Sequence, residues 1–147
     1  MSRKKSGFFD LIPTVKSLLL SYMGATLTDV GRIPIIIDNS QSPPFPVMET
    51  SAELLYLLKF ADKDDVFGFK DELERSQCLQ WLFFWHGSGA PYQGNTNFFR
   101  RQKEQIPFAI NRFRNETLRV FGVLEIQLSG KYTGEPREYL AGKGKGM

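Results

Sequence analysis

The sequence lacks the residue types that build disulfide frameworks and metal centres. Its 147 residues include one cysteine, Cys78, and one histidine, His86. A single cysteine cannot form an internal disulfide or a multi-thiolate zinc site, and a single histidine cannot form a histidine cluster around a metal. The sequence also assigns no activating partner to Cys78, so we interpret it as a packed thiol rather than a nucleophile. We therefore expect no bound metal.

A long apolar segment is also missing. The longest uncharged run near the start of the chain is Ser17–Thr28, which is far shorter than the roughly 20 residues that a membrane-spanning helix needs. Asp10, Pro13 and Lys16 interrupt the apolar stretch before it, as they would not in a signal peptide. These features predict a cytoplasmic protein with no membrane partner.

Positive charge is in small excess and is concentrated at the two ends. The formal net charge is +3, with Arg3, Lys4 and Lys5 in the opening segment and Lys143 and Lys145 in the closing one. Solvated ends account for such clusters without a ligand. Because the interior has no basic stripe interleaved with aromatic residues, we expect no nucleic-acid partner.

Aromatic residues, in contrast, are plentiful. Thirteen Phe, five Tyr and two Trp bring them to 14% of the chain, and 41% of all residues are apolar. Each buried ring removes roughly 150–250 Å² from water, so the chain can form a hydrophobic core. Residues 1–29 show no strand pattern, and we expect weak helix and coil there.

Two short strands and a helix are predicted after residue 30. Ile33–Asp38 is dense in β-branched residues, Asn39–Pro44 consists of turn formers, and Phe45–Met48 is apolar again, which indicates a β-hairpin. A helix should follow to Phe60, with Thr50 or Ser51 as its N-cap. The charged residues 61–65 then indicate an exposed linker and the domain boundary.

Long helices are predicted for the rest of the chain. The first is expected at roughly Phe69–Trp85, with Gly87–Gly94 breaking it, and the second at about Phe98–Leu128. In the second, apolar residues recur at spacings of three and four from Ile106 onward, which gives one apolar stripe along the helix. Pro107 can restart this helix, so two segments are an alternative.

The end of the hairpin and the start of the next helix form the strongest candidate site. Unpaired amides and a partial positive charge at a helix N-terminus suit an anionic ligand. The Thr50 hydroxyl could supplement these amides, and Glu49 could accept an ammonium group. If the Ile33–Pro34 peptide is cis, the backbone of Ile33 is exposed for pairing with an extended peptide. A helix start after a turn explains the same residues without any ligand.

These residues also resemble a known family. Gly31–Asp38, a loop and Val47–Leu57 look like the glutathione-binding second half of the thioredoxin-like domain of a glutathione transferase. Several later segments resemble, in order and spacing, the helical domain of its fungal nitrogen-regulator-like branch: Gln80–Trp85, Gly87–Gly94, Asn97–Arg100, Ile106–Pro107, Arg114–Glu125 and Arg137–Gly142. The resemblance covers roughly residues 30–142.

The resemblance implies a fold and domain boundaries. The expected fold is mainly α with a small β-hairpin, in which a partial thioredoxin-like α/β unit precedes an all-helical domain of the glutathione transferase C-terminal type. Residues 1–29 would be a divergent N-terminal segment, 30–62 the glutathione-binding unit, and 66–147 a truncated helical domain.

The resemblance also implies site residues. The backbone of Ile33 would bind the cysteinyl part of glutathione, with Pro34 as the cis-proline. Glu49 and Thr50 would hold the γ-glutamyl end, although the family usually has Ser where Thr50 stands. Three aromatic residues are candidates for the wall that holds an apolar co-substrate, and core packing explains them equally simply: Trp81, Phe84 and Tyr92.

Two parts of the family pattern are missing. Residues 1–29 contain nothing like the first β-α-β unit, which in this family supplies the group that activates the glutathione thiol. Hydroxyls are available there, but none follows a recognisable strand: Ser6, Ser17, Ser21 and Tyr22. The helix expected after Gly142 is also missing, and its absence should leave the apolar stripe from Ile106 partly uncovered.

The implied function is the conjugation of the glutathione thiolate to an electrophilic apolar small molecule. Glutathione would be a co-substrate, no other cofactor is expected, and the family pattern implies a homodimer. One alternative is a non-catalytic module that binds glutathione or another protein. Another is a defective gene product without a stable fold.

Overall fold

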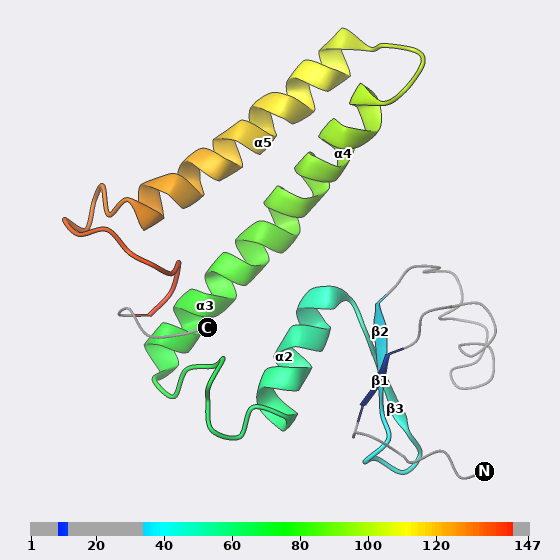
Figure 1. Cartoon of the computed structure of the whole chain (residues 1–147), viewed down its shortest axis with the longest axis vertical. Coiled ribbons are helices and arrows are strands. Elements are labelled where there is room, and N and C mark those ends of the chain that lie inside the picture. The colour runs from blue at the N-terminus through cyan, green and yellow to red at the C-terminus, as the bar shows by residue number, and fades with distance from the viewer. Residues whose placement is uncertain (1–8, 12–33, 143–147) are drawn as a thin grey trace. The chain divides into compact units, whose positions relative to one another are not determined.

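The computed structural model describes residues 9–11 and 34–142 (Figure 1). The chain divides into two compact units, residues 1–61 and 62–147. The expected clusters of basic residues at both ends lie outside the described residues. No helix in the described ranges is long and apolar enough to cross a bilayer.

The first unit contains a three-stranded antiparallel sheet in the order β1-β2-β3. Strand β2 (Ile35–Asp38) and strand β3 (Phe45–Met48) form the hairpin that the sequence predicts. All four residues of β2 are buried, which the β-branched side chains of Ile35–Ile37 favour, and the fourth is the polar Asp38.

The third strand of this sheet is a correction to the expectation for residues 1–29. Strand β1 (Phe9–Leu11) pairs with β2, with Leu11 opposite Ile36. Three residues are too few to show an alternating pattern, so this strand could not be predicted from the sequence. The ladder of β2, far along the chain, provides the hydrogen-bond partners that make this segment a strand.

The carboxylate of Asp38 holds the hairpin loop and the following helix together. It accepts hydrogen bonds from the Ser40 amide at 2.8 Å, the Ser40 hydroxyl at 2.6 Å and the Tyr56 hydroxyl at 2.7 Å. Gln41 donates a further bond at 3.2 Å. These donors, with the Ser40 hydroxyl foremost and Tyr56 next, lower the pKa of Asp38 to about 2.

Helix α2 (Thr50–Phe60) begins directly after β3, with one residue between them. That residue, Glu49, is the N-cap, and no side chain caps the helix. The prediction of Thr50 or Ser51 as N-cap is therefore wrong. The strand continues to Met48, and this leaves only Glu49 to make the turn into the helix.

The second unit begins with an ordered loop at the predicted linker. The Asp62 carboxylate accepts hydrogen bonds from the amides of Val66, Phe67 and Gly68 at 2.8–2.9 Å. Helix α3 (Glu72–Phe84) follows, and its N-cap Asp71 accepts bonds from the amides of its first turn.

The predicted break at Gly87–Gly94 is wrong. The helix continues from α3 through a π-helical turn, η1 (Trp85–Gly89), into α4 (Ala90–Arg100), and Figure 1 shows one unbroken coil. Gly89 explains why: a Cβ there would lie 2.1 Å from the Trp85 ring. Gly89 therefore makes room for the Trp85 ring against the helix, and it does not interrupt the helix.

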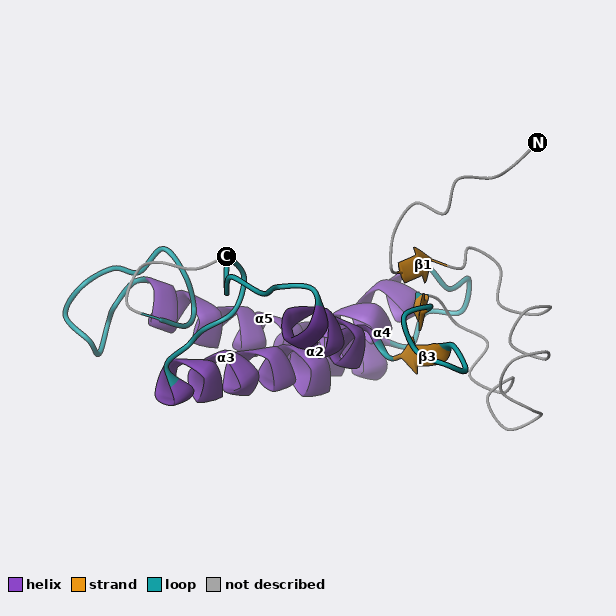
Figure 2. Ribbon diagram, turned by 90° about the horizontal axis from the view of Figure 1, so that it is seen from below, coloured by secondary structure: helices purple, strands orange, loops and turns teal. Residues whose placement is uncertain are grey.

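Helices α4 and α5 (Pro107–Leu128) lie side by side and antiparallel (Figures 1 and 2). The single helix predicted over Phe98–Leu128 is thus wrong, and the two-segment alternative with a restart at Pro107 is correct. Buried Thr96 and the Thr117 hydroxyl meet between the helices at 3.0 Å. On α5, Val120 is buried, whereas Phe121 and the N-cap residue Ile106 remain more than two-fifths exposed.

The segment after α5 folds back onto the end of that helix. The Arg137 amide donates to the Leu128 carbonyl at 2.7 Å, and the Gln127 side chain donates to the Leu140 carbonyl at 2.9 Å. Gly130, at φ 67°, makes the turn, and a Cβ there would collide with the Glu135 carbonyl. Ala141 is buried as a result.

Candidate functional site

The β2–β3 register brings together predicted site residues that are 15 positions apart. Ile35 pairs with Met48 and Ile36 with Val47. Pro34 directly precedes Ile35 and Glu49 directly follows Met48, so both residues stand at the same end of the hairpin. Both residues are exposed, and Thr50 next to them is exposed as well. Three of the four predicted glutathione-binding residues therefore form one accessible corner of the first unit.

Glu49 has an unusual backbone at this corner. Its φ is 70° and its ψ is 113°, a conformation that costs a non-glycine residue of order 1–3 kcal/mol. The turn from strand to helix imposes this geometry, yet the position carries a glutamate with an exposed side chain. The corner thus has a carboxylate at the start of α2, on a residue whose backbone conformation is strained.

The start of α2 adds hydrogen-bond donors to the corner. The first intrahelical bond runs from the Glu53 amide to the Glu49 carbonyl at 2.9 Å. No side chain of the N-cap residue caps the helix, and a helix N-terminus favours an anionic group. The exposed Thr50 hydroxyl lies at the same turn. The corner can therefore bind a carboxylate at the helix and an ammonium group at Glu49.

A second acid lies one helical turn beyond Glu49, and sequence reasoning missed it. Glu53 is 4% exposed, and its Oε1 atom has no hydrogen-bond partner. Burial, together with the charge of Glu49, raises the pKa of Glu53. The only signal in the sequence was its position among leucines in a predicted helix.

The cis-proline prediction falls outside the part of the chain that the structure describes. Ile33 is not among the described residues, so the Ile33–Pro34 peptide and the role of the Ile33 backbone stay predictions. The hydroxyls considered for thiol activation also lie outside those residues: Ser6, Ser17, Ser21 and Tyr22.

The three aromatic candidates for a co-substrate wall all lie in the second unit, and they do not form one group. Trp81 and Phe84 contact each other edge to face on α3, with ring centroids 5.7 Å apart. Tyr92, on α4, instead packs against Phe113 of α5 at 6.2 Å. Their role in binding a co-substrate stays a prediction.

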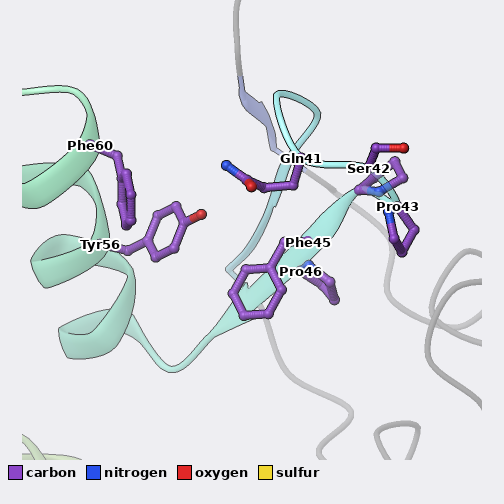
Figure 3. Close-up of a pocket in the computed structure, with 8 residues that line it drawn as sticks. Gln41, Ser42, Pro43, Phe45, Pro46, Tyr56 and Phe60 are labelled. Carbon is purple, nitrogen blue, oxygen red and sulfur yellow. The ribbon is translucent and has the colours of Figure 1, made fainter.

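A pocket that the sequence did not predict lies on the first unit, between the hairpin loop and α2 (Figure 3). Its volume is about 630 Å³, and Phe45, Tyr56 and Phe60 line one side in a row of rings, with centroid distances of 5.9 and 4.4 Å. Pro43, Pro44 and Pro46 lie on the hairpin side. The i, i+4 spacing of Tyr56 and Phe60 was the one available signal.

Comparison with known proteins identifies relatives of the chain. No protein-family model matches it. The disulfide-bond oxidoreductase YfcG of Escherichia coli (strain K12) is 38% identical over 102 residues, which are 67% of this chain and 46% of that protein.

Solved structures match the fold of the chain. A glutathione transferase homologue from Lodderomyces elongisporus, with two glutathione molecules per subunit, superposes with a TM-score of 0.71 at 31% identity. The match covers 84% of this chain and 58% of that one. The glutathione transferase URE2P6 from Phanerochaete chrysosporium, in complex with oxidised glutathione, superposes at 0.68 with 36% identity, over 80% of this chain and 51% of that one.

These similarities confirm the predicted fold class. The chain spans about half the length of the proteins it matches. It is mainly helical with a small antiparallel hairpin unit, and it corresponds to part of the thioredoxin-like domain and part of the helical domain of its structural neighbours. The chain belongs to the glutathione S-transferase superfamily, in a branch similar to the Ure2-type fungal transferases.

Proposed function

We propose that the chain binds glutathione at the corner formed by Pro34, Glu49 and Thr50. The observation that supports this proposal is the pairing of Ile35 with Met48, which puts the adjoining Pro34 and Glu49 at one end of the hairpin, at the start of α2. The solved neighbours that contain glutathione support it. In this proposal residues 30–62 are the glutathione-binding unit and 66–147 the helical domain.

Each group at the corner has a distinct role in the proposed complex. The Glu49 carboxylate accepts hydrogen bonds from the γ-glutamyl ammonium group. The first-turn amides of α2 and the Thr50 hydroxyl donate to the γ-glutamyl carboxylate. The Ile33 backbone pairs with the cysteinyl part, next to Pro34. The ammonium group of the ligand therefore faces the negative Glu49, and its carboxylate faces the positive end of the α2 dipole.

The reaction proposed for the bound tripeptide is conjugation to an electrophilic apolar molecule. The glutathione thiol loses its proton to solvent, the thiolate sulfur forms a bond to the electrophilic carbon, and the leaving group departs with the bonding electrons. Trp81, Phe84 and Tyr92 are the proposed apolar wall for that molecule. The protein would act in the cytoplasm as a homodimer.

A non-catalytic glutathione-binding or protein-interaction module is the second candidate. A thiol without a hydrogen-bond donor keeps a pKa near 8.5 and is mostly protonated at neutral pH. The corner at Glu49 supplies groups for the γ-glutamyl end, which is remote from the sulfur. Binding without turnover would therefore follow from the corner alone.

Calorimetric titration with reduced glutathione tests the site. Glu49→Gln keeps the size of the side chain and removes its charge. A charge-assisted hydrogen bond contributes about 1.5–3 kcal/mol, so the affinity should fall roughly 10- to 100-fold. Glu104→Gln is the matched control, because Glu104 is an exposed acid in the loop between α4 and α5.

The outcomes separate the candidates. Equal affinities for the two variants and the unmodified chain would remove the assignment of Glu49. Binding together with turnover of 1-chloro-2,4-dinitrobenzene supports the transferase. Binding without turnover supports the module, and the absence of binding combined with a non-cooperative melt supports the defective product.

A further inference from the structure

The second unit contains a cavity lined by its own residues, among them Trp81, which is also a candidate for the co-substrate wall. Its volume is about 360 Å³. Cys78, Trp81 and Leu82 of α3, Trp85 of η1 and Leu128 at the end of α5 line it, together with residues 138–141 of the closing segment. Sites for small molecules usually have volumes of about 300–1,000 Å³, and an engineered apolar cavity of about 150 Å³ binds benzene. The cavity therefore has room for a molecule larger than one aromatic ring.

The inner wall of the cavity is apolar. It includes both tryptophans of the chain and its only cysteine. One backbone carbonyl of the lining residues, that of Leu140, already accepts a hydrogen bond from the Gln127 side chain at 2.9 Å. A ligand therefore gains little from polar groups inside and gains mainly from burying its own apolar surface.

The opening of the cavity carries a negative charge. Glu138 lines it and is exposed. Within the described ranges, no Lys or Arg forms an ion pair with this carboxylate.

From this arrangement we infer that the cavity binds a small apolar molecule with a single positive charge, such as an aromatic ammonium compound. The apolar body lies against Trp81 and Trp85, and the ammonium group lies at the opening, beside Glu138. Binding involves no covalent step. Burial raises the pKa of the Cys78 thiol, so the thiol is mostly protonated at neutral pH and reacts slowly.

The two tryptophans and the single cysteine provide direct reporters of this cavity. Benzyltrimethylammonium is the probe, and neopentylbenzene is its uncharged counterpart of the same shape. Titration with the cationic probe should give a saturable change in tryptophan emission. The same probe should slow the alkylation of Cys78 by iodoacetamide at least threefold at saturation. The uncharged compound should bind more weakly.

Charge variants test the role of the opening. Glu138→Gln should weaken binding of benzyltrimethylammonium about three- to tenfold and leave that of neopentylbenzene unchanged. Glu135→Gln is the matched control, because Glu135 is exposed in the same segment and does not line the cavity. It should bind both compounds as the unmodified chain does.

Three results would each overturn the inference. One is the absence of a saturable change in tryptophan emission up to millimolar probe. Another is a change in emission without protection of Cys78, which would place the probe elsewhere. The third is equal binding of the cationic probe by Glu138→Gln and Glu135→Gln. None of these outcomes depends on whether the chain binds glutathione.

Discussion

Each unit of this protein departs from regular backbone geometry at one helix junction, and the two departures have opposite purposes. In the first unit, Glu49 takes a φ of 70° before α2 and keeps an exposed carboxylate. In the second, the π-helical turn η1 before α4 contains Gly89, which is buried under the Trp85 ring. A glycine at position 49 would remove the backbone strain, whereas an alanine at position 89 would collide with the Trp85 ring.

The difference shows how to separate function from packing in this chain. A residue that is strained, exposed and polar is unfavourable for folding, so its side chain points to a role in binding. A glycine with a ring where its Cβ would be is explained by packing alone. Asp65 is also exposed with a positive φ, but its carboxylate forms an ion pair with Lys70 at 3.9 Å. By this reasoning Glu49 is our proposed site residue, and Gly89 is a structural one.

The largest expected effect is that of Gly89→Ala. The new methyl group would lie 2.1 Å from the Trp85 ring, so the ring or the helix must move. We expect the free energy of unfolding of the second unit to fall by about 2–3 kcal/mol. Chemical denaturation followed by circular dichroism at 222 nm measures this change, and a shift in tryptophan emission should accompany it.

Gly87→Ala is the control for that substitution. Gly87 lies in the same π turn, and a Cβ there would meet nothing within 4 Å. Because alanine favours helix over glycine, stability should rise by about 0.5–1 kcal/mol. If both variants lost stability equally, the π turn itself, and not the Trp85 ring, would explain the glycines.

The next largest effect concerns the polar groups that each unit buries. In the second unit Thr96 is buried with the Thr117 hydroxyl at 3.0 Å, whereas in the first unit Glu53 is buried with Oε1 unpaired. An unpaired buried polar group costs about 1–3 kcal/mol. Glu53→Leu should therefore raise the free energy of unfolding by about 1–2 kcal/mol at pH 7, and the melting temperature should rise with it.

The pH dependence sharpens this prediction. The pKa of Glu53 is raised by folding, so its charge destabilises the fold as pH rises above the ordinary value of 4.5. The pKa of Asp38 is lowered to about 2, so its contribution is present above 3.8 and is lost as pH falls towards 2. Melts from pH 2 to 8 should show that Glu53→Leu removes the first dependence and keeps the second. A variant that changed neither would show that Glu53 is solvated.

The smallest expected effect on stability is that of Glu49→Gly. Glycine removes the strain of the positive φ, and its greater freedom in the unfolded chain offsets part of that gain, which leaves about 0.5–1 kcal/mol of stabilisation. Glutathione binding should nevertheless be lost. Asp65→Gly is the matched control, since Asp65 has a φ of 52°. It should gain similar stability and leave binding unchanged, and loss of binding in both variants would argue against a role for the Glu49 carboxylate.

Local patterns explain where the sequence predicted the fold correctly. The β-branched run of Ile35–Ile37, the turn formers after Asp38 and the strand Phe45–Met48 favour a hairpin by themselves, and the hairpin is present with the expected second strand. The restart at Pro107 was available as an alternative, because proline fits the first turn of a helix.

Local patterns failed where a distant partner decides the outcome. The strand Phe9–Leu11 depends on pairing with β2. Likewise, the burial of Glu53 and the cavity beside Cys78 arise only when separate segments meet. The helix through Gly87–Gly94 was missed for a local reason, because its glycines were interpreted as a break although the Trp85 ring, four residues earlier, lies against Gly89.

The sequence by itself determined the chemistry that this protein can offer: it carries Pro34, Glu49 and Thr50, it has one cysteine and one histidine, and its family pattern is readable in order and spacing. Only the tertiary structure decided which of these groups are neighbours. The antiparallel register put Pro34 and Glu49 at the same end of the hairpin, and the return of residues 138–141 closed a cavity around both tryptophans. Side-chain identity is a local property of the chain, whereas proximity and burial depend on contacts between segments that are far apart in it.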